Sequence, residues 1–209
     1  MTKARTRRED RPAIILDAAE RLIRRSGTRT LTIDAVALEA ELSKGGVLHH
    51  FSSKDALITA LAERKLAEIK EDVARHEAAQ EPGPSAIPLG LIAHARQVYC
   101  REDGFPRALL LASADDPDAF AGFNAFLKQQ LVRMETTSAS PGDGAMLTFA
   151  ALGLMLSRTL GFHCLAGPEL ARLFDALEAS ARALPKADPA DLGEAGAHAA
   201  IVEETGSGA

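Results

Sequence analysis

A short stretch near the start of the chain combines cationic side chains, histidines and glycines at helical spacing. Ser43 and Lys44 precede two glycines, and His49 and His50 follow four residues further on. A hydroxyl N-cap and a lysine on the first turn favour a phosphate at the helix start, where backbone N–H groups and the positive end of the helix dipole point. Lysine and histidine also donate hydrogen bonds to phosphates and to the N7 and O6 edges of purines. The stretch therefore has the chemistry of nucleic-acid binding.

The two glycines of this stretch, Gly45 and Gly46, lower its helix propensity by about 1 kcal/mol each. Because they carry no side chain, they would let the backbone approach the floor of a DNA groove. The alternative is a helix that merely starts weakly. The adjacent histidines point in different directions on a helix, so they are unsuited to hold one metal ion together. Lys54, on the first turn of the next helix, is expected to bind the neighbouring phosphate.

Apolar periodicity predicts the helices that position these residues. The supporting helix covers about 11–25 and ends at Gly27, and Ser53 caps a long fourth helix over 54–79. Between them, two short helices over 33–40 and 44–51 are capped by Thr32 and Ser43 and joined by a tight turn. Two short helices, a tight turn and a preceding helix indicate a helix-turn-helix inside a three-helix unit.

The residues of this unit strongly resemble the DNA-binding domain of the tetracycline-repressor-like (TetR/AcrR) family over about residues 11–60. The resemblance is carried by a Ser-Lys-Gly helix start, a His-Phe helix end and a Ser-Lys-acid-x-Leu start of the next helix, all in register. It implies a bacterial transcriptional regulator, most often a homodimeric repressor that a small-molecule effector releases from a palindromic operator. The residues expected to contact double-stranded DNA are Thr32, Ser43, Lys44, Gly45, Gly46, His49, His50 and Lys54.

The chain departs from the family pattern at two positions. Leu48 stands where the family usually has a tyrosine that contacts the DNA backbone, so Leu48 is left out of the predicted set. Glu41 stands in the turn where the family favours glycine, so we expect Glu41 to adopt a left-handed or similar conformation at some energetic cost.

The rest of the chain is predicted to be helical as well, over 87–101, 106–114, 117–137, 144–165 and 168–184. No segment alternates with period two, and aromatic residues make up only 4% of the chain, so the fold class is all-α. The predicted organisation is a flexible basic arm (1–10), the helix-turn-helix domain (11–57), a helical ligand-binding and dimerisation domain (58–185) and a disordered tail (186–209).

The resemblance implies that the last two helices form a four-helix bundle with those of a second copy. Small residues on 144–165 and apolar residues on 168–184 fit that role, although both sets also fit the core of a single subunit. The predicted dimer interface comprises Ala150, Gly153, Ser157, Gly161, Leu170, Leu173, Leu177 and Ala181.

The effector of such a regulator binds among the middle helices, and its identity is not visible in the sequence. Candidate lining residues combine apolar bulk with polar ends, and ordinary core packing is the alternative for each of them: His94, Tyr99, Cys100, Phe105, Phe123, Phe126, Met134, Phe149, Arg158 and His163. Arg158 stands alone in an apolar helix and should find an anion. We favour an internal partner such as Glu135 or Asp175 over an acidic effector.

Composition and charge limit the alternatives. Residues 1–70 hold 14 Lys and Arg against 10 Asp and Glu, whereas the rest of the chain has a net charge of −9, which argues against a non-specific architectural DNA binder. Two cysteines give no disulfide framework, and we expect a reducing, cytoplasmic location with no membrane span, no cofactor and no metal. The spacing of Cys100 and Cys164 from His94 and His163 assembles no local pair of nucleophile and base, which argues against an enzyme, so no catalytic residues are predicted. Redox or metal sensing through the same four residues remains an alternative.

Overall fold

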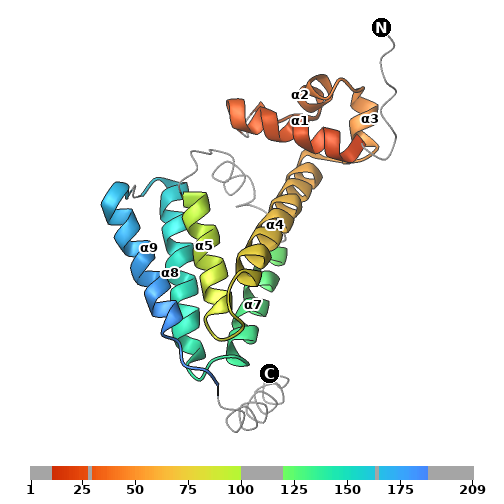
Figure 1. Ribbon diagram of the computed structural model, residues 1–209. Helices are drawn as coiled ribbons and strands as arrows, with labels where there is room; N and C mark the ends of the chain where they lie inside the picture. The colour runs from red at the N-terminus through yellow and green to blue at the C-terminus, as the bar shows by residue number, and fades with distance from the viewer. Residues whose placement is uncertain (1–10, 28–29, 100–119, 163–164, 188–209) are drawn as a thin grey trace, which may run out of the picture. The chain divides into compact units, whose positions relative to one another are not determined.

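The computed structural model describes residues 11–27, 30–99, 120–162 and 165–187, and it divides into two compact units (Figure 1). The described residues of the N-terminal unit are 11–27, 30–69 and 120–124, and those of the C-terminal unit are 70–99, 125–162 and 165–187. Within the described ranges the regular structure is helical, apart from an isolated antiparallel bridge between Ser138 and Lys186. The all-α prediction is therefore confirmed. The predicted helix over 106–114, the basic arm and most of the tail lie outside the described residues.

The N-terminal unit contains α1 (Arg11–Ser26), α2 (Ile33–Glu39), α3 (Lys44–Leu48) and the first part of α4 (Lys54–Ala78). The three predicted N-caps are present: the side-chain oxygens of Thr32, Ser43 and Ser53 accept hydrogen bonds from backbone N–H groups three residues ahead, at 3.1, 3.0 and 3.0 Å. Gly27 ends α1 with φ +74°. The predicted helix starts therefore follow from local capping chemistry.

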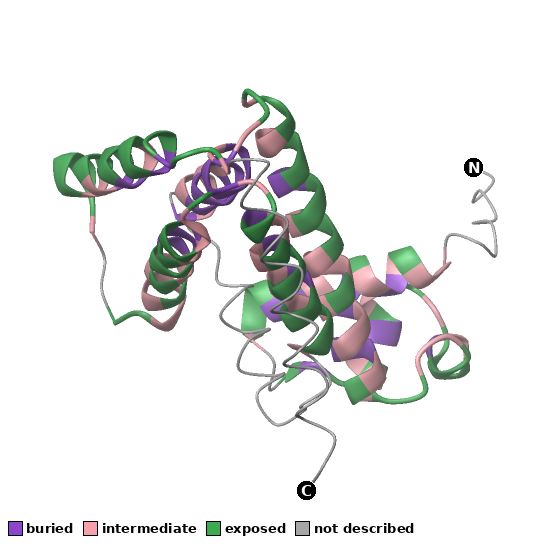
Figure 2. Ribbon diagram, turned by 90° about the horizontal axis from the view of Figure 1, so that it is seen from below, coloured by how far each residue is buried: buried purple, intermediate pink, exposed green. Residues whose placement is uncertain are grey.

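Apolar residues of all four helices form one core in this unit. The fully buried members include Ile15, Ile23, Val36, Val47 and Leu61. In Figure 2 the buried residues are scattered along the helices and alternate with exposed ones, as the helical period requires.

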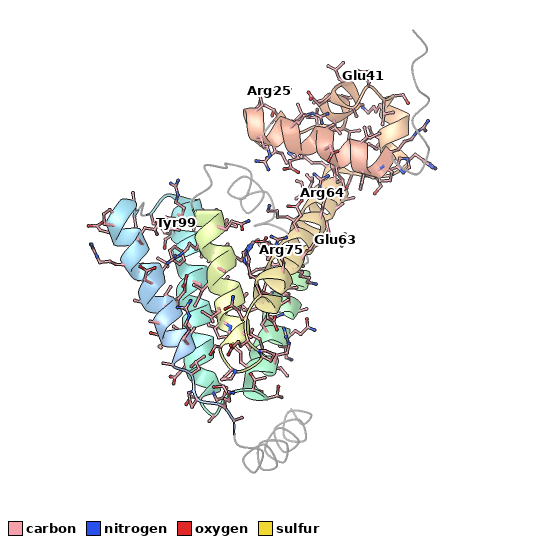
Figure 3. The ribbon with its side chains drawn as sticks, in the orientation of Figure 1. Arg25, Glu41, Glu63, Arg64, Arg75 and Tyr99 are labelled. Carbon is pink, nitrogen blue, oxygen red and sulfur yellow. The ribbon has the colours of Figure 1, made fainter. Side chains whose placement is uncertain are left out.

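Charged side chains hold the helices of the N-terminal unit together at the surface. Arg64 of α4, which Figure 3 shows below α1, pairs with Asp17 and Glu20 of α1. Glu39 of α2 accepts hydrogen bonds from Arg21 and Arg25 of α1, each at 3.0 Å. These two arginine hydrogen bonds, Arg21 first, lower the pKa of the Glu39 carboxyl from its ordinary value of 4.5.

The turn between α2 and α3 has the conformation expected from its sequence. Glu41 has φ +54°, and within the described residues it is the non-glycine residue with positive φ. The third helix is shorter than predicted, because α3 ends at Leu48 instead of Phe51. Residues 49–51 still turn, with the N–H of Phe51 donating to the carbonyl of Val47 at 2.9 Å. The next helix start, capped by Ser53, leaves too little chain for α3 to continue.

The C-terminal unit is built around α5 (Ala86–Tyr99), which packs against α8 (Pro141–Leu160) and α9 (Gly167–Arg182). These three helices lie side by side in Figure 1. The end of α4 and most of α7 (Ala121–Glu135) complete the unit. The core among α5, α8 and α9 consists of Leu89, Ile92, Ala95, Tyr99, Leu147, Ala151, Phe174, Leu177, Ala181 and Leu184.

The limits of α8 differ from the predicted helix over 144–165. Pro141, expected to separate helices, lies in the first turn of α8, where its missing N–H is harmless. Gly161 ends the helix in a left-handed conformation with φ +78°. The prediction that Gly161 belongs to the helical stripe was therefore wrong, because this glycine is the C-terminal stop.

The end of α4 is in close contact with α5 and α7. A Cβ added at Gly90 would lie 3.0 Å from the backbone nitrogen of Glu77, so the α5 glycine lets the two helices approach closely. Glu77 also pairs with Arg133 of α7. Among the described helices, none is both long and apolar enough to cross a membrane.

Candidate nucleic-acid interface

The short helix α3 buries one side and exposes the other. Val47 is fully buried in the core of the N-terminal unit. Lys44, Gly45, Leu48 and His49 are exposed, and we call these four residues the α3 outward face. The caps of Ser43 at one end and Ser53 beyond the other hold this face in place. A helix-turn-helix reads DNA with such a second helix.

Lys44 lies beside an acidic side chain of α2. Its Nζ is 3.0 Å from Oδ2 of Asp34, and the two side chains are 58% and 70% exposed. Exposed ion pairs contribute only about 0–1 kcal/mol, so the ammonium can exchange this carboxylate for a phosphate or a guanine edge at little cost. Asp34 was not predicted from the sequence, where it appears as an ordinary acidic residue in a helix first turn.

The two glycines of α3 differ in their surroundings. A Cβ at Gly46 would lie 3.2 Å from the capping Oγ of Ser43, a tight contact that would press on the N-cap. A Cβ at Gly45 would meet nothing within 4 Å. The described residues therefore give no packing reason for glycine at position 45, which supports a role in approach to a partner.

The other predicted contact residues lie around α3. His49 is exposed and His50 is half-buried, with ring centroids 5.0 Å apart in an edge-to-face arrangement. Thr32 and Ser43 are exposed, and their oxygens accept the capping bonds while their hydroxyl hydrogens can still be donated. Lys54 is half-buried at the first turn of α4. The predicted set thus surrounds the helix-turn-helix within a single unit.

The comparisons with known proteins agree with this arrangement. The model of the bacterial regulatory proteins of the tetR family matches residues 15–61, and the tetracyclin repressor-like C-terminal domain matches residues 90–182. The chain belongs to the TetR family. In this TetR-family chain, 79 residues are 38% identical to the HTH-type transcriptional regulator BetI of Burkholderia thailandensis, a match that spans 38% of the chain and 40% of that relative.

Solved structures with the same fold cover most of this TetR-family chain. A TetR-family member from Streptomyces coelicolor A3 has a TM-score of 0.62 at 21% identity, covering 80% of this chain and 98% of its own. The multidrug binding protein EbrR complexed with malachite green has a TM-score of 0.61 at 20% identity, covering 82% and 98%. At these identities the likeness shows the fold alone.

In the C-terminal unit, the structure brings some of the predicted effector residues together. The hydroxyl of Tyr99, at the end of α5 in Figure 3, accepts a hydrogen bond from the backbone N–H of Leu165 at 2.9 Å. The guanidinium of Arg158 lies 5.8 Å from the centroid of the Tyr99 ring. Asp175, one of the anions predicted for Arg158, pairs instead with Arg96 at 2.5 Å.

His94 has a polar partner that sequence analysis missed. Its Nδ1 lies 2.5 Å from Oδ2 of Asp72 on α4, and both side chains are buried. Asp72 stands in a charged part of α4, next to Glu71 and one turn from Arg75, so its inward direction could not be predicted from the residue pattern. The pair joins α4 to α5 inside the C-terminal unit.

The remaining effector candidates fall in different places. Phe126 and Met134 of α7 are buried, and Phe123 is half-buried. Phe149 of α8 is 53% exposed, so its ring does not line the interior of the subunit. The other three candidates lie outside the described residues: Cys100, Phe105 and His163.

The predicted dimer residues of α8 and those of α9 differ in their exposure. On α8, Ala150 and Gly153 are exposed and Ser157 is half-buried. On α9, Leu177 and Ala181 are buried in the core of the subunit, Leu170 packs against that core, and Leu173 is half-buried. The α9 stripe thus faces α5 and α8, because its buried members pack there.

Sequence analysis did not predict that large apolar side chains form an exposed face on α8. Met146, Phe149 and Leu156 are 62%, 53% and 48% exposed, and they lie with Gly153 at helical spacings of three and four. We call these four residues the α8 outward face. The sequence signal for this face was that the large apolar residues of the helix fall on two opposite sides. The core of a subunit needs only one apolar side of a helix.

Four residues were considered for catalysis or for redox and metal sensing: His94, Cys100, His163 and Cys164. Of these, His94 alone lies among the described residues, and it is hydrogen-bonded to Asp72. The described residues contain no cluster of three metal-binding side chains.

Proposed function

We propose that this TetR-family transcriptional regulator is a homodimeric repressor that binds a palindromic DNA operator and is released from it by a small-molecule effector. It acts on DNA in the bacterial cytoplasm and by binding rather than catalysis. The observation that carries the proposal is the α3 outward face, a helix surface with a lysine, a histidine and an unexplained glycine, held by two caps in a helix-turn-helix.

DNA contact is proposed for the residues that surround this face. Lys44 and His49 would meet base edges or phosphates in the major groove, and Lys54 would bind the flanking backbone. Gly45 would let the backbone of α3 approach the groove closely. A single short helix reads about half a site, so two copies must bind half-sites about 34–36 Å apart.

A second copy is proposed to pack on the α8 outward face. Three large apolar side chains exposed on one helix are unusual for a monomer and typical of a protein interface. Gly153 lies among them, and a Cβ there would meet nothing within 4 Å of its own subunit. A two-fold axis through this face would place the same residues of both copies against each other.

An effector is proposed to act through the contacts that join α5 to α4. The buried Asp72–His94 pair and the close approach at Gly90 join the two helices, so a shift of α5 would be passed to the end of α4. Arg158, over the ring of Tyr99, adds a cationic and aromatic pair near the end of α5. EbrR, a protein of the same fold, was solved with malachite green, which supports a small molecule as the effector class. The effector must bind the DNA-incompetent state more tightly, since only a difference in affinity shifts the equilibrium.

The test is selection of DNA from a random duplex pool by the purified full chain at near-physiological salt, with its mass measured by light scattering. We expect an enriched palindromic site and the mass of a dimer. A monomeric mass, or a mixture of bound sequences without a shared motif, would overturn the proposal.

The dimer surface is tested separately with Gly153→Leu. A Cβ at this position has room among the described residues of its own subunit, and a leucine there would enter the partner's space, so we expect the dimer to weaken while the melting of each subunit is retained. Gly142→Ala, at another open glycine of α8, is the matched control. An unaltered dimer mass for Gly153→Leu would place the interface elsewhere.

A further inference from the structure

One large apolar side chain of α3 is left outside the core. Val47 is completely buried, and Phe51 packs against the core of the N-terminal unit. Leu48 lies between them in sequence but is 39% exposed. The helix therefore presents Leu48 to whatever α3 binds.

The neighbours of Leu48 show what kind of surface it belongs to. Lys44 lies one turn before it and Gly45 three residues before it, both exposed on the same α3 outward face. Among the described residues, a Cβ at Gly45 would meet nothing within 4 Å, so the space beside this residue of the face is open. A cation and a gap beside an apolar group fit a surface that is charged overall but has local apolar points.

DNA offers one such point in its major groove. A leucine side chain makes no hydrogen bonds, so it cannot bind a phosphate or the donors and acceptors of base edges. The C5 methyl of thymine is the apolar group on the groove floor, and apolar side chains contact it. Cytosine lacks this methyl, so contact with it discriminates between bases.

We propose that Leu48 is a specificity-determining residue that contacts the C5 methyl of one thymine in each operator half-site. This inference rests on the proposed function, because it requires α3 to enter the major groove. It assigns base reading to the position where the family usually places a tyrosine directed at the DNA backbone.

The test removes the methyl from DNA without changing any hydrogen bond. Each thymine of the selected operator is replaced in turn by deoxyuridine, and the affinity of the full chain is measured by a mobility-shift titration. We expect one symmetric pair of positions at which the loss is roughly fourfold per half-site, which corresponds to about 0.8 kcal/mol for one buried carbon.

The variant Leu48→Ala links that loss to the leucine. It should bind more weakly to the thymine operator and should no longer distinguish thymine from deoxyuridine at the sensitive pair. Leu38→Ala is the matched control, since Leu38 is 83% exposed in the same unit but on α2. The control should keep the full dependence on the methyl.

The outcomes separate this inference from the proposed function. Failure to select any operator would overturn both. A selected operator without thymine, an operator insensitive to every deoxyuridine, or an unchanged methyl dependence in Leu48→Ala would overturn the role of Leu48 and leave the repressor proposal standing.

Discussion

The α3 outward face and the α8 outward face are both exposed helix surfaces, yet their chemistry is opposite. The α3 face combines a lysine, a glycine and a leucine of a five-residue helix with the histidine of its C-cap. The α8 face presents a methionine, a phenylalanine and a leucine around a glycine within a 20-residue helix. A polar, cationic surface suits a hydrated polyanion, whereas an extended apolar surface must exclude water against another apolar surface.

The difference also predicts how each surface responds to salt. Binding that neutralises phosphates releases counterions and weakens steeply as salt rises. Burial of apolar area does not weaken with salt. Substitutions can therefore disable one surface at a time and test whether each surface has the partner assigned to it.

The largest expected effect comes from a charge on the α8 outward face. Phe149→Glu would place two buried carboxylates in the proposed two-fold interface, and we expect dimer affinity to fall roughly a hundredfold or more. Operator binding should fall with it, because both half-sites must be occupied together. Light scattering over a dilution series measures the first effect and a mobility shift the second.

The matched control for this charge is Ala125→Glu, at an exposed position of α7. It should leave the mass and the DNA affinity unchanged. A dimeric Phe149→Glu protein would show that the apolar face of α8 has another partner.

On the α3 outward face, Lys44→Ala should weaken operator binding by about 1–3 kcal/mol if Lys44 reads a base, and the dimer should be unaffected. Lys128→Ala removes the same charge from an exposed position on α7 and serves as control. A mobility-shift titration at two salt concentrations separates base reading from a phosphate contact, since loss of a phosphate contact lowers the salt slope by about 1. Equal affinities of the two lysine variants would remove Lys44 from the interface.

The N-terminal and C-terminal units differ in how much of their structure could be predicted from the sequence. In the N-terminal unit, the helix starts at Thr32, Ser43 and Ser53 and the left-handed Glu41 were predicted correctly, because capping and backbone strain depend on neighbours in the chain. The end of α3 was predicted three residues too late, because the sequence of residues 49–51 is compatible with both a helix and a turn.

In the C-terminal unit, the roles of apolar residues depend on which helix packs where. Leu177 and Leu156 look alike in sequence, yet the first is buried in the subunit and the second is exposed. Periodicity gives the face of a helix but not the partner of that face. Asp72 illustrates the same limit, because its inward direction depends on His94 of another helix.

A smaller effect separates the needs of folding from those of binding at Gly45. Gly45→Ala adds a methyl into open space within the subunit and removes a helix-breaking residue, so the free energy of unfolding should rise by as much as about 1 kcal/mol. DNA affinity should fall at the same time, because the methyl would stand between α3 and the groove. Gly142→Ala, which is equally open but lies on α8, should leave DNA affinity unchanged. Unaltered DNA binding by Gly45→Ala would show that this glycine only weakens the helix start.

The smallest expected effect concerns Glu39, which joins α2 to α1 and so supports α3 indirectly. Arg21 and Arg25 lower the pKa of its carboxyl, so the ionised carboxylate is more stable in the folded state than in the unfolded state. That stabilisation is complete above the ordinary pKa of 4.5 and is lost as the pH falls through the lower pKa of the folded state. Glu39→Gln should therefore melt slightly below the parent protein at pH 7, and the difference in Tm should vanish toward acid pH. Glu63→Gln, at an exposed position of α4, controls for net charge. A difference in Tm that grows as the pH falls would contradict the sign, because only a carboxyl with a raised pKa stabilises the folded state more in acid.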